Sequence, residues 1–318
     1  MLEQWTEKLS AFLEIPRNEI GQIGGGKTKI TGCVDVAMLQ SLDRKDGVKS
    51  FITQYGQVIV DECHHLAAYS FEKIMRTFRA KYLLGLTATP LRKDGLHPII
   101  EMQCGPIRYK VSEKQLAKVQ TYRHLLVMRP TNFASETTDI QKLYREIAED
   151  KGRNNLIFND VLQALEQGRK PIIITERVAH VEQLAQRFDP FVKNVLVLTG
   201  RVSKKERSRQ LKQLAEMSSA DEFLVLATGK YIGEGFDEAR LDTLFLTMPV
   251  SWKGILQQYV GRLHREHLNK TDVRVYDYVD GYVSVLKRMF AKRKKSYHAM
   301  GYVEAVKTAD ESEQMRLF

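Results

Sequence analysis

The chain has little of what would place it in several common classes of protein. Its 318 residues include 3 cysteines, 8 prolines and 2 tryptophans. Cys33, Cys63 and Cys104 have no paired spacing, which argues against a disulfide framework and favours a reducing compartment. Cys63 is followed by two histidines, but nothing nearby completes a tetrahedral set of ligands, so we predict no zinc site there.

Long apolar runs are also missing, and no segment is long enough to span a membrane. The first segment, Leu2–Leu13, has an amphipathic pattern with acidic side chains, which differs from a secretory signal. Neither internal repeats nor low-complexity stretches occur. With 43% hydrophobic residues and this length, the sequence predicts a globular, cytoplasmic protein of two domains.

Positive charge is in excess. Lys and Arg number 49 against 39 Asp and Glu, which gives a net charge of +10. This balance favours a polyanionic partner, although charge by itself is a weak indicator. One basic cluster follows a predicted helix N-cap at Ser203, and another, Lys287–Lys295, lies on the last predicted helix. Both clusters also fit an ordinary solvated helix face.

The most informative segment is residues 57–64, in which an apolar, β-branched run ends in Asp61 and Glu62, with His64 following. Such a run is typical of a buried strand in a parallel sheet. Carboxylates at its end would lie where open α/β sheets bind ligands. Asp61 is then placed to hold a Mg²⁺ that bridges nucleotide phosphates, and Glu62 to orient or deprotonate an attacking water. Taken alone, the same letters also fit a strand that runs into an acidic surface turn.

Four further segments combine a strand or helix with a polar cluster at matching intervals. They are residues 81–90, 171–177, 223–237 and 257–265. Together with residues 57–64, they resemble motifs II to VI of the superfamily 2, DEAD/DEAH-box-like helicases and translocases, closest to XPB-like and type III restriction-like motors. The resemblance runs to about residue 280. It implies an α/β fold with two RecA-like parallel-sheet domains, the first one incomplete, with ATP and Mg²⁺ as cofactors and nucleic acid as partner, DNA favoured over RNA.

The resemblance also implies roles in catalysis. Mg²⁺ binding and water activation would fall to Asp61 and Glu62. From a helix of the second domain, Arg262 and Arg265 would stabilise charge on the transferring phosphoryl group, an effect worth ~10³–10⁵ in turnover. Residues that would couple hydrolysis to the grip on nucleic acid are His64, Thr87, Thr89 and Gln258. For the two threonines, capping of the next turn is the alternative interpretation.

Two further groups of residues would make binding contacts in the same family. Gly235 and Asp237 resemble the motif V turn, where the acidic group meets the nucleotide ribose or the facing domain. Candidate contacts with the nucleic-acid backbone are Gln40, Arg177, Thr199, Arg201 and Lys230. Each of these is also compatible with an ordinary polar surface position.

Residues Gly21–Thr28 match the letters of a P-loop, G-x-x-x-x-G-K-[ST]. A P-loop must follow a buried strand and open a helix, yet residues 16–20 are not an apolar run and residues 34–39 read as a strand. We therefore expect a flexible glycine-rich loop here. The helix at residues 2–13 resembles the one after motif Ia, so we expect the true P-loop upstream, in a longer product or a separate polypeptide. The remaining alternative makes Lys27 a working P-loop lysine of a smaller nucleotide enzyme.

Alternating helix and strand signals predict two doubly wound α/β domains. The expected segments are a partial first domain at 1–111, an interdomain connection at 112–151, a second domain at 152–282 and a basic C-terminal helix and tail at 283–318. The expected strands lie near 34–39, 57–61, 81–86, 106–111, 171–175, 194–198, 222–227, 241–247 and 273–279. The sequence thus predicts the motor portion of an ATP-dependent DNA helicase or translocase that needs an upstream P-loop segment. The alternative is a nucleic-acid-binding or regulatory module that does not hydrolyse ATP.

Overall fold

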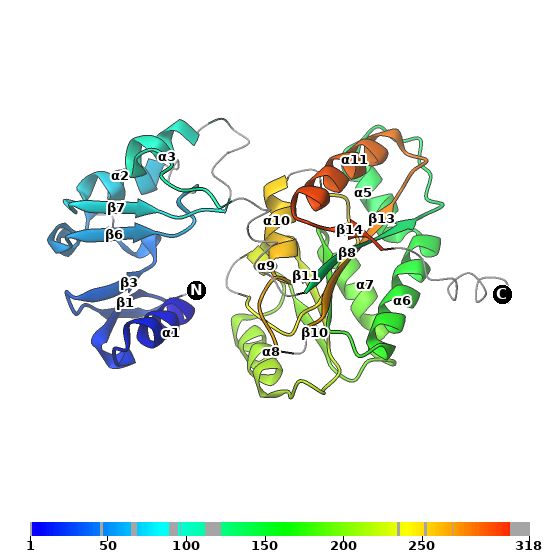
Figure 1. The fold of residues 1–318 in the computed structure, drawn as a ribbon, viewed down its shortest axis with the longest axis horizontal. Coiled ribbons are helices and arrows are strands. Elements are labelled where there is room, and N and C mark those ends of the chain that lie inside the picture. Colours follow the sequence, from blue (N-terminus) through cyan, green and yellow to red (C-terminus); the bar gives the residue numbers. More distant parts are fainter. Residues whose placement is uncertain are drawn as a thin grey trace. The chain divides into compact units, whose positions relative to one another are not determined.

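The chain divides into two compact units, Met1–Lys110 and Val111–Phe318, drawn from blue to cyan and from green to red in Figure 1. The computed structural model describes residues 2–44, 47–64, 69–88, 95, 97–111, 122–233, 236–250, 253–268 and 270–305. Within these residues, no helix combines the length and the apolar character needed to cross a bilayer.

Unit 1 alternates helices with short strands. Its elements are α1 (Leu2–Leu13), β1 (Ile20–Gly24), β2 (Lys27–Lys29), β3 (Val34–Ala37), β4 (Asp43–Arg44), β5 (Gly47–Val48), β6 (Gln57–Val60), α2 (Tyr69–Thr77), β7 (Tyr82–Gly85) and α3 (His97–Cys104), with short 3₁₀ turns at Arg17–Glu19, Leu39–Ser41 and Ser50–Gln54. The strands form three separate sheets, ordered β2-β1-β3, β4-β5 and β6-β7. In the described part of unit 1, β6 and β7 therefore pair with each other and not with the β1 sheet.

The parallel pair β6–β7 packs on one side only. Its inner side contacts a small core that contains the buried residues Cys63, Met75 and Ile100. The alternation of a strand turns every second side chain to the opposite face. On that outer face Ile59 is 50% exposed and Tyr82 is 59% exposed. The pair therefore presents an apolar face that the rest of the described unit leaves uncovered.

The prediction of a strand near residues 106–111 is wrong. Residues 105–111 are exposed and take no regular structure. Alternating Ile107, Tyr109 and Val111 produced the strand signal, but β-structure depends on a neighbouring strand that supplies hydrogen bonds, and the described residues offer none here. The strands at β3, β6 and β7 lie within the expected ranges.

Unit 2 is a doubly wound α/β layer structure. Its elements are β8 (Arg123–Pro130), α5 (Ile140–Glu149), α6 (Lys151–Glu166), β9 (Pro171–Thr175), α7 (Val178–Phe188), β10 (Val195–Leu198), α8 (Lys204–Glu216), β11 (Leu224–Thr228), α9 (Gly229–Gly233), β12 (Thr243–Leu246), α10 (Lys253–Gly261), β13 (Asp272–Val279), α11 (Ser284–Ala299) and β14 (Val303–Glu304). Seven of these strands form one parallel sheet in the order β10-β11-β9-β12-β13-β8-β14. The five strands expected in the second domain all occur, with bounds that differ by at most two residues.

Both faces of this sheet are covered, which explains why its central strands are continuously apolar. Helices α6 and α7 pack on one face, around Ile157, Leu184 and Phe188. Helices α8, α9, α10 and α11 pack on the other, where Leu256 and Tyr297 join the core (Figure 1). Ser203 caps α8 as predicted, since its hydroxyl accepts a 3.1 Å hydrogen bond from the Glu206 N–H.

Two segments that the sequence analysis placed outside the second domain are integral to unit 2. β8, expected in the connection, pairs with β13 along its whole length, and α5 joins the core beneath α11. Helix α11, expected as an appended basic helix, buries Arg293, whose guanidinium bonds the Asp277 carboxylate at 2.7 Å. Long-range pairing decides both placements, and local sequence signals do not report it.

Candidate functional site

The acidic pair lies at the carboxyl end of β6. Asp61 accepts a 2.9 Å hydrogen bond from the Glu62 N–H and a 3.2 Å bond from the indole Nε1–H of Trp5 on α1. Glu62 has a φ of 50°. A non-glycine residue in this left-handed region is uncommon and costs roughly 1–3 kcal/mol, and such strain is concentrated at functional sites. Trp5 as a partner of Asp61 is a contact that the sequence analysis missed.

A short chain of polar contacts joins the end of β6 to the end of β7. His64 Nδ1 lies 3.1 Å from Glu62 Oε2 and 3.0 Å from the Thr87 hydroxyl. Parallel strands place their carboxyl ends at one edge of a sheet, which is why residues this far apart in sequence meet. The structure thus brings together Asp61, Glu62, His64 and Thr87, while Thr89 lies outside the described residues.

These side chains fit a Mg²⁺–nucleotide site. Proteins hold Mg²⁺ through one or two carboxylates together with substrate phosphates, and a carboxylate with two bonded donors still has lone pairs to offer. Asp61 would hold the ion, and the ion would neutralise charge on the phosphates. Glu62, whose position is fixed by the backbone turn and by His64, would accept a proton from water.

The P-loop letters at Gly21–Thr28 fall in a β-hairpin. β1 and β2 pair antiparallel, with Ile23 opposite Thr28 and Gly24 opposite Lys27. Gly24, Gly25 and Gly26 at the turn all have positive φ, at 131°, 62° and 85°. No helix follows the turn, so the backbone N–H groups are not arranged as the cradle that a P-loop requires. The expectation that this match is not a P-loop is confirmed, but the expected flexible loop is wrong, because residues 20–24 and 27–29 form paired strands.

Helix α10 ends earlier than expected. Its last residue is Gly261, and Arg262 and Arg265 lie in the turns beyond it. The N–H groups of Arg262, Leu263 and His264 bond carbonyls three residues back, which is the tighter spacing of a 3₁₀ turn. The expectation that both arginines lie on the helix is therefore wrong in its geometry, although they remain three positions apart.

Each arginine meets the segment that resembles motif V. Arg262 Nη1 donates a 2.9 Å hydrogen bond to the carbonyl of Phe236, and Arg265 Nε lies 2.9 Å from Asp237 Oδ1. Gly235 lies outside the described residues. Lys270 supports this turn from behind, because its ammonium donates to the carbonyls of Leu263 and Arg265 at 2.8 Å each. Burial lowers the pKa of Lys270 to about 8.

Glu176, Gly229 and Tyr259 lie close together at the carboxyl ends of β9 and β11. The sequence analysis did not connect these three residues. The hydroxyl of Tyr259 on α10 donates a 2.6 Å bond to Glu176 Oε1. Burial raises the pKa of Tyr259, with the charge of Glu176 adding to the effect, so the hydroxyl stays protonated. A Cβ on Gly229 would lie 1.6 Å from that hydroxyl, so only glycine fits. The one available signal was that Tyr259 lies three positions before Arg262.

The residues predicted to contact nucleic acid differ in their exposure and in their hydrogen-bond partners. Gln40 is exposed beside β3, and Arg201 is exposed and paired with Glu182 at 3.0 Å. Arg177 donates to the Gln141 carbonyl at 2.7 Å. Thr199 is 1% exposed, so its side chain is not accessible to a bound strand. The Lys230 side chain lies outside the described part of the structure. Gln258, predicted as a coupling residue, is half-buried on α10.

Fold and site together define the class: a parallel-sheet α/β protein with RecA-like units and with acidic and arginine clusters at its strand and helix ends. Residues 1–92 match the family of the type III restriction enzyme, res subunit, and residues 153–267 match the helicase conserved C-terminal domain. The chain therefore belongs to the superfamily 2 helicases.

Individual relatives agree. A protein of Acanthamoeba polyphaga mimivirus, whose name assigns it to the ATP-dependent RNA helicases, is 24% identical over 275 residues, 84% of this chain. The chain spans 51% of that relative's length. The DNA 3'-5' translocase XPB2 of Sulfurisphaera tokodaii is 32% identical over 117 residues, 37% of this chain and 25% of that protein.

Among solved structures, S. cerevisiae Dbp5 bound to RNA and ADP BeF₃ has the same fold. It matches with a TM-score of 0.67 at 14% identity, and the match covers 99% of this chain and 77% of Dbp5. The likeness at this level of identity concerns the RecA-like fold.

Proposed function

We propose that the chain is the motor portion of an ATP-dependent DNA helicase or translocase. The observation that carries the proposal is the contact chain Glu62–His64–Thr87, which links the water-activating carboxylate to the end of the neighbouring strand. A change at the nucleotide would alter the partners of Glu62, and His64 would pass that change to Thr87. Such a link gives hydrolysis a mechanical output.

In this proposal the second unit contributes positive charge. Arg262 and Arg265 would stabilise the transferring phosphoryl group, as guanidinium groups do in phosphoryl transfer. Arg265 would exchange its partner Asp237, 2.9 Å away, for phosphate oxygens when nucleotide binds. Asp237 would then be available to the ribose. Cycles of ATP binding and hydrolysis would move the protein along a strand.

Hydrolysis in this proposal depends on a phosphate-binding loop supplied by a further segment or polypeptide. The reason is the hairpin at Gly21–Thr28, which provides no helix N-terminus for the phosphates. The same hairpin favours the second candidate, a nucleic-acid-binding or regulatory module that does not hydrolyse ATP. Ordered Asp61 and Glu62 contacts favour the motor, since a module without hydrolysis has no chemical use for them.

DNA is the proposed substrate because the Sulfurisphaera relative is named as a DNA translocase, although the mimivirus relative is named for RNA. Contacts would fall mainly on phosphates, so binding should weaken steeply as salt rises. Arg177 and Arg201 are the candidate contacts with described, accessible guanidinium groups.

The experiment is ATP hydrolysis by this chain, with and without duplex DNA or RNA, with Glu62→Gln as control. The motor is supported if the chain alone shows no turnover, if adding a P-loop segment gives turnover, and if Glu62→Gln abolishes that turnover. No turnover under either condition, with salt-dependent nucleic-acid binding intact, supports the binding module.

Lys27 provides a separate check. Nucleotide binding by the chain alone that is lost in Lys27→Ala would restore Gly21–Thr28 as a phosphate site and overturn our interpretation of the hairpin. Full retention of binding in Lys27→Ala would end that alternative.

A further inference from the structure

Two neighbouring strands of unit 2 send the chain to opposite faces of the sheet. β9 and β12 pair in parallel. After β9 the chain passes through Glu176 and Arg177 into α7, which packs with α6 on one face. After β12 it passes through Pro249 toward α10, which packs on the other face. Where adjacent connections diverge in this way, a crevice opens at the carboxyl ends of the strands, and open α/β proteins bind ligands there.

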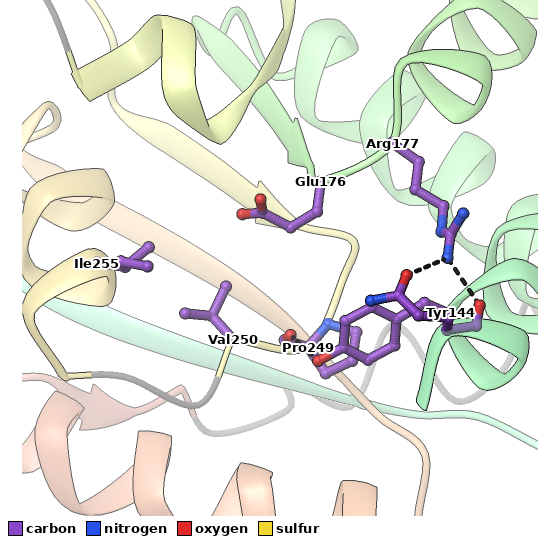
Figure 2. A pocket seen from close by; sticks show the side chains of 7 residues that line it. Tyr144, Glu176, Arg177, Pro249, Val250 and Ile255 are labelled. Atoms are coloured by element: carbon purple, nitrogen blue, oxygen red, sulfur yellow. Dashed lines mark hydrogen bonds between the residues drawn. The ribbon is translucent and has the colours of Figure 1, made fainter. Parts of the chain in front are cut away.

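The crevice is present and has a defined lining (Figure 2). Its volume is about 390 Å³, within the range of ~300–1,000 Å³ that is typical of small-molecule sites. Val250 and Ile255 form an apolar side, and Tyr144 of α5 lies across from them. Glu176 and Arg177 project from the end of β9 over the same space. The crevice thus combines one aromatic ring, one apolar wall and two charged groups.

Its polar side chains are held in place by neighbours. Arg177 Nη2 donates to the carbonyl and to the side-chain oxygen of Gln141, at 2.7 and 3.2 Å. Glu176 accepts the 2.6 Å bond from Tyr259, and the Tyr144 hydroxyl donates to the Pro249 carbonyl at 3.3 Å. A guanidinium carries five N–H donors and a carboxylate several lone pairs, so both groups keep bonding capacity toward a ligand.

These features select a class of ligand. The Glu176 carboxylate accepts hydrogen bonds and repels anions, so it does not suit a phosphate in the depth of the crevice. It does suit an amino group, while Arg177 suits a carbonyl or a ring nitrogen. A flat group with donors and acceptors on its edge, placed between the Tyr144 ring and the apolar wall, satisfies all of these contacts. Nucleobases with an exocyclic amino group have this chemistry.

We propose that the crevice between β9 and β12 receives one unstacked nucleobase of a bound strand, with its exocyclic amino group toward Glu176 and its ring against Tyr144. The inference rests on the proposed function, because it assumes that a strand binds to unit 2. Adenine, cytosine and guanine carry the amino group, and thymine and uracil do not. The base must be unpaired to enter, since its hydrogen-bonding edge faces the protein.

The test measures binding of fluorescein-labelled single strands to the full chain by anisotropy, with oligo(dA), oligo(dC), oligo(dT) and an abasic strand. Stacking of a base on an aromatic side chain is worth roughly 5- to 150-fold in affinity. We expect Tyr144→Ala to weaken oligo(dA) and oligo(dC) by that factor and to leave the abasic strand unchanged. Tyr144→Phe retains the ring and should stay close to the wild type.

Two further variants separate the site from general effects. Glu176→Gln keeps an acceptor for Tyr259 but removes the negative charge that strengthens the bond to an amino group, and we expect it to reduce the preference for oligo(dA) over oligo(dT). Tyr282→Ala removes a tyrosine that is 73% exposed and lies outside the crevice lining, and should change nothing. Circular dichroism and thermal melting establish that each variant is folded.

The outcomes are distinct. If all strands, the abasic one included, bind wild type and Tyr144→Ala equally, the base site is overturned while nucleic-acid binding stands. If no strand binds the wild type, the proposed function fails as well. Competition with AMP and dCMP tests whether the crevice takes a base of a strand or a free mononucleotide. If either mononucleotide displaces oligo(dA) at equal concentration, the proposal of a site for a base of a strand is overturned.

Discussion

His64 Nδ1 and the Thr87 hydroxyl lie 3.0 Å apart, and the contact ties together the carboxyl ends of β6 and β7. The same nitrogen lies 3.1 Å from Glu62 Oε2. Because Glu62 already occupies an uncommon backbone conformation, these side-chain contacts decide where its carboxylate lies. A small change at Thr87 should therefore reach Glu62 through His64.

Replacing Thr87 with valine should lower nucleic-acid-stimulated ATP hydrolysis by up to ~100-fold, because small displacements of a catalytic group have effects of this size. Loss of one hydrogen bond should change the free energy of unfolding by no more than ~1.5 kcal/mol. Steady-state turnover, measured with and without an added P-loop segment of the kind proposed above, and urea unfolding are the measurements. Thr77→Val is the matched control, since the Thr77 hydroxyl bonds a carbonyl of its own helix. Equal turnover of both variants would contradict the coupling role.

The glycines at 229 and 261 should respond in opposite ways to alanine. A Cβ at Gly229 would lie 1.6 Å from the Tyr259 hydroxyl, whereas a Cβ at Gly261 has no described atom within 4 Å. Gly229→Ala should destabilise the chain by about 1–3 kcal/mol through overpacking. Gly261→Ala, near the end of α10, should be neutral or should stabilise by up to ~1 kcal/mol. Chemical denaturation of the two variants tests this, and similar destabilisation by both would refute it.

Stability should fall as the solution becomes acidic. Burial lowers the pKa of His180 and of His264 to about 3 each, so the folded chain keeps both imidazoles neutral. Below the unfolded pKa of about 6.5, the unfolded chain binds the extra protons, and each histidine costs about 1.4 kcal/mol of stability per pH unit until the folded pKa is reached. Above about pH 6.5 both imidazoles are neutral in the folded and in the unfolded chain, so this loss of stability is absent.

Urea unfolding over a pH series measures this slope. His264→Gln should reduce the slope between about pH 6 and pH 4 by roughly one proton equivalent. His298→Gln, at a position that is 47% exposed, serves as the control and should leave it unchanged. A slope that His264→Gln does not alter would show that this imidazole titrates normally in the folded chain.

Loss of the buried Arg293–Asp277 ion pair under α11 should lower the free energy of unfolding far more than loss of any surface ion pair. Asp277 accepts bonds of 2.7 Å from Arg293 and 2.9 Å from the Tyr297 hydroxyl, and both side chains of the ion pair are almost fully buried. Asp277→Ala leaves the guanidinium buried without its partner, which should cost ~3–5 kcal/mol. Glu182→Gln breaks the exposed pair with Arg201 and should cost less than ~1 kcal/mol. Thermal melting compares the two variants directly.

The sequence alone determined the strands with continuous apolar runs. β9 and β11 could be predicted because a strand covered on both faces leaves a continuous apolar run. β6 was expected to be a buried strand of this kind, but only one of its faces is covered, and Gln57 and Ile59 are exposed. The sequence also determined the acidic pair at the end of β6, and it excluded the P-loop letters at Gly21–Thr28, since a P-loop needs a strand before it and a helix after it.

Only the tertiary structure decided the rest. β8 was assigned to a connection because its partner β13 lies about 150 residues later, and residues 106–111 were assigned to a strand although the described residues hold no strand to pair with them. The structure alone shows that Thr199 is buried and that a hydrogen bond between Glu176 and Tyr259 joins separate elements. It also shows the crevice, which lies where the chain leaves two adjacent strands toward opposite faces of the sheet. The physical reason is common to all of them. Local sequence reports the burial and propensity of one segment, whereas strand partners, burial of polar residues and crevices depend on which distant segments meet.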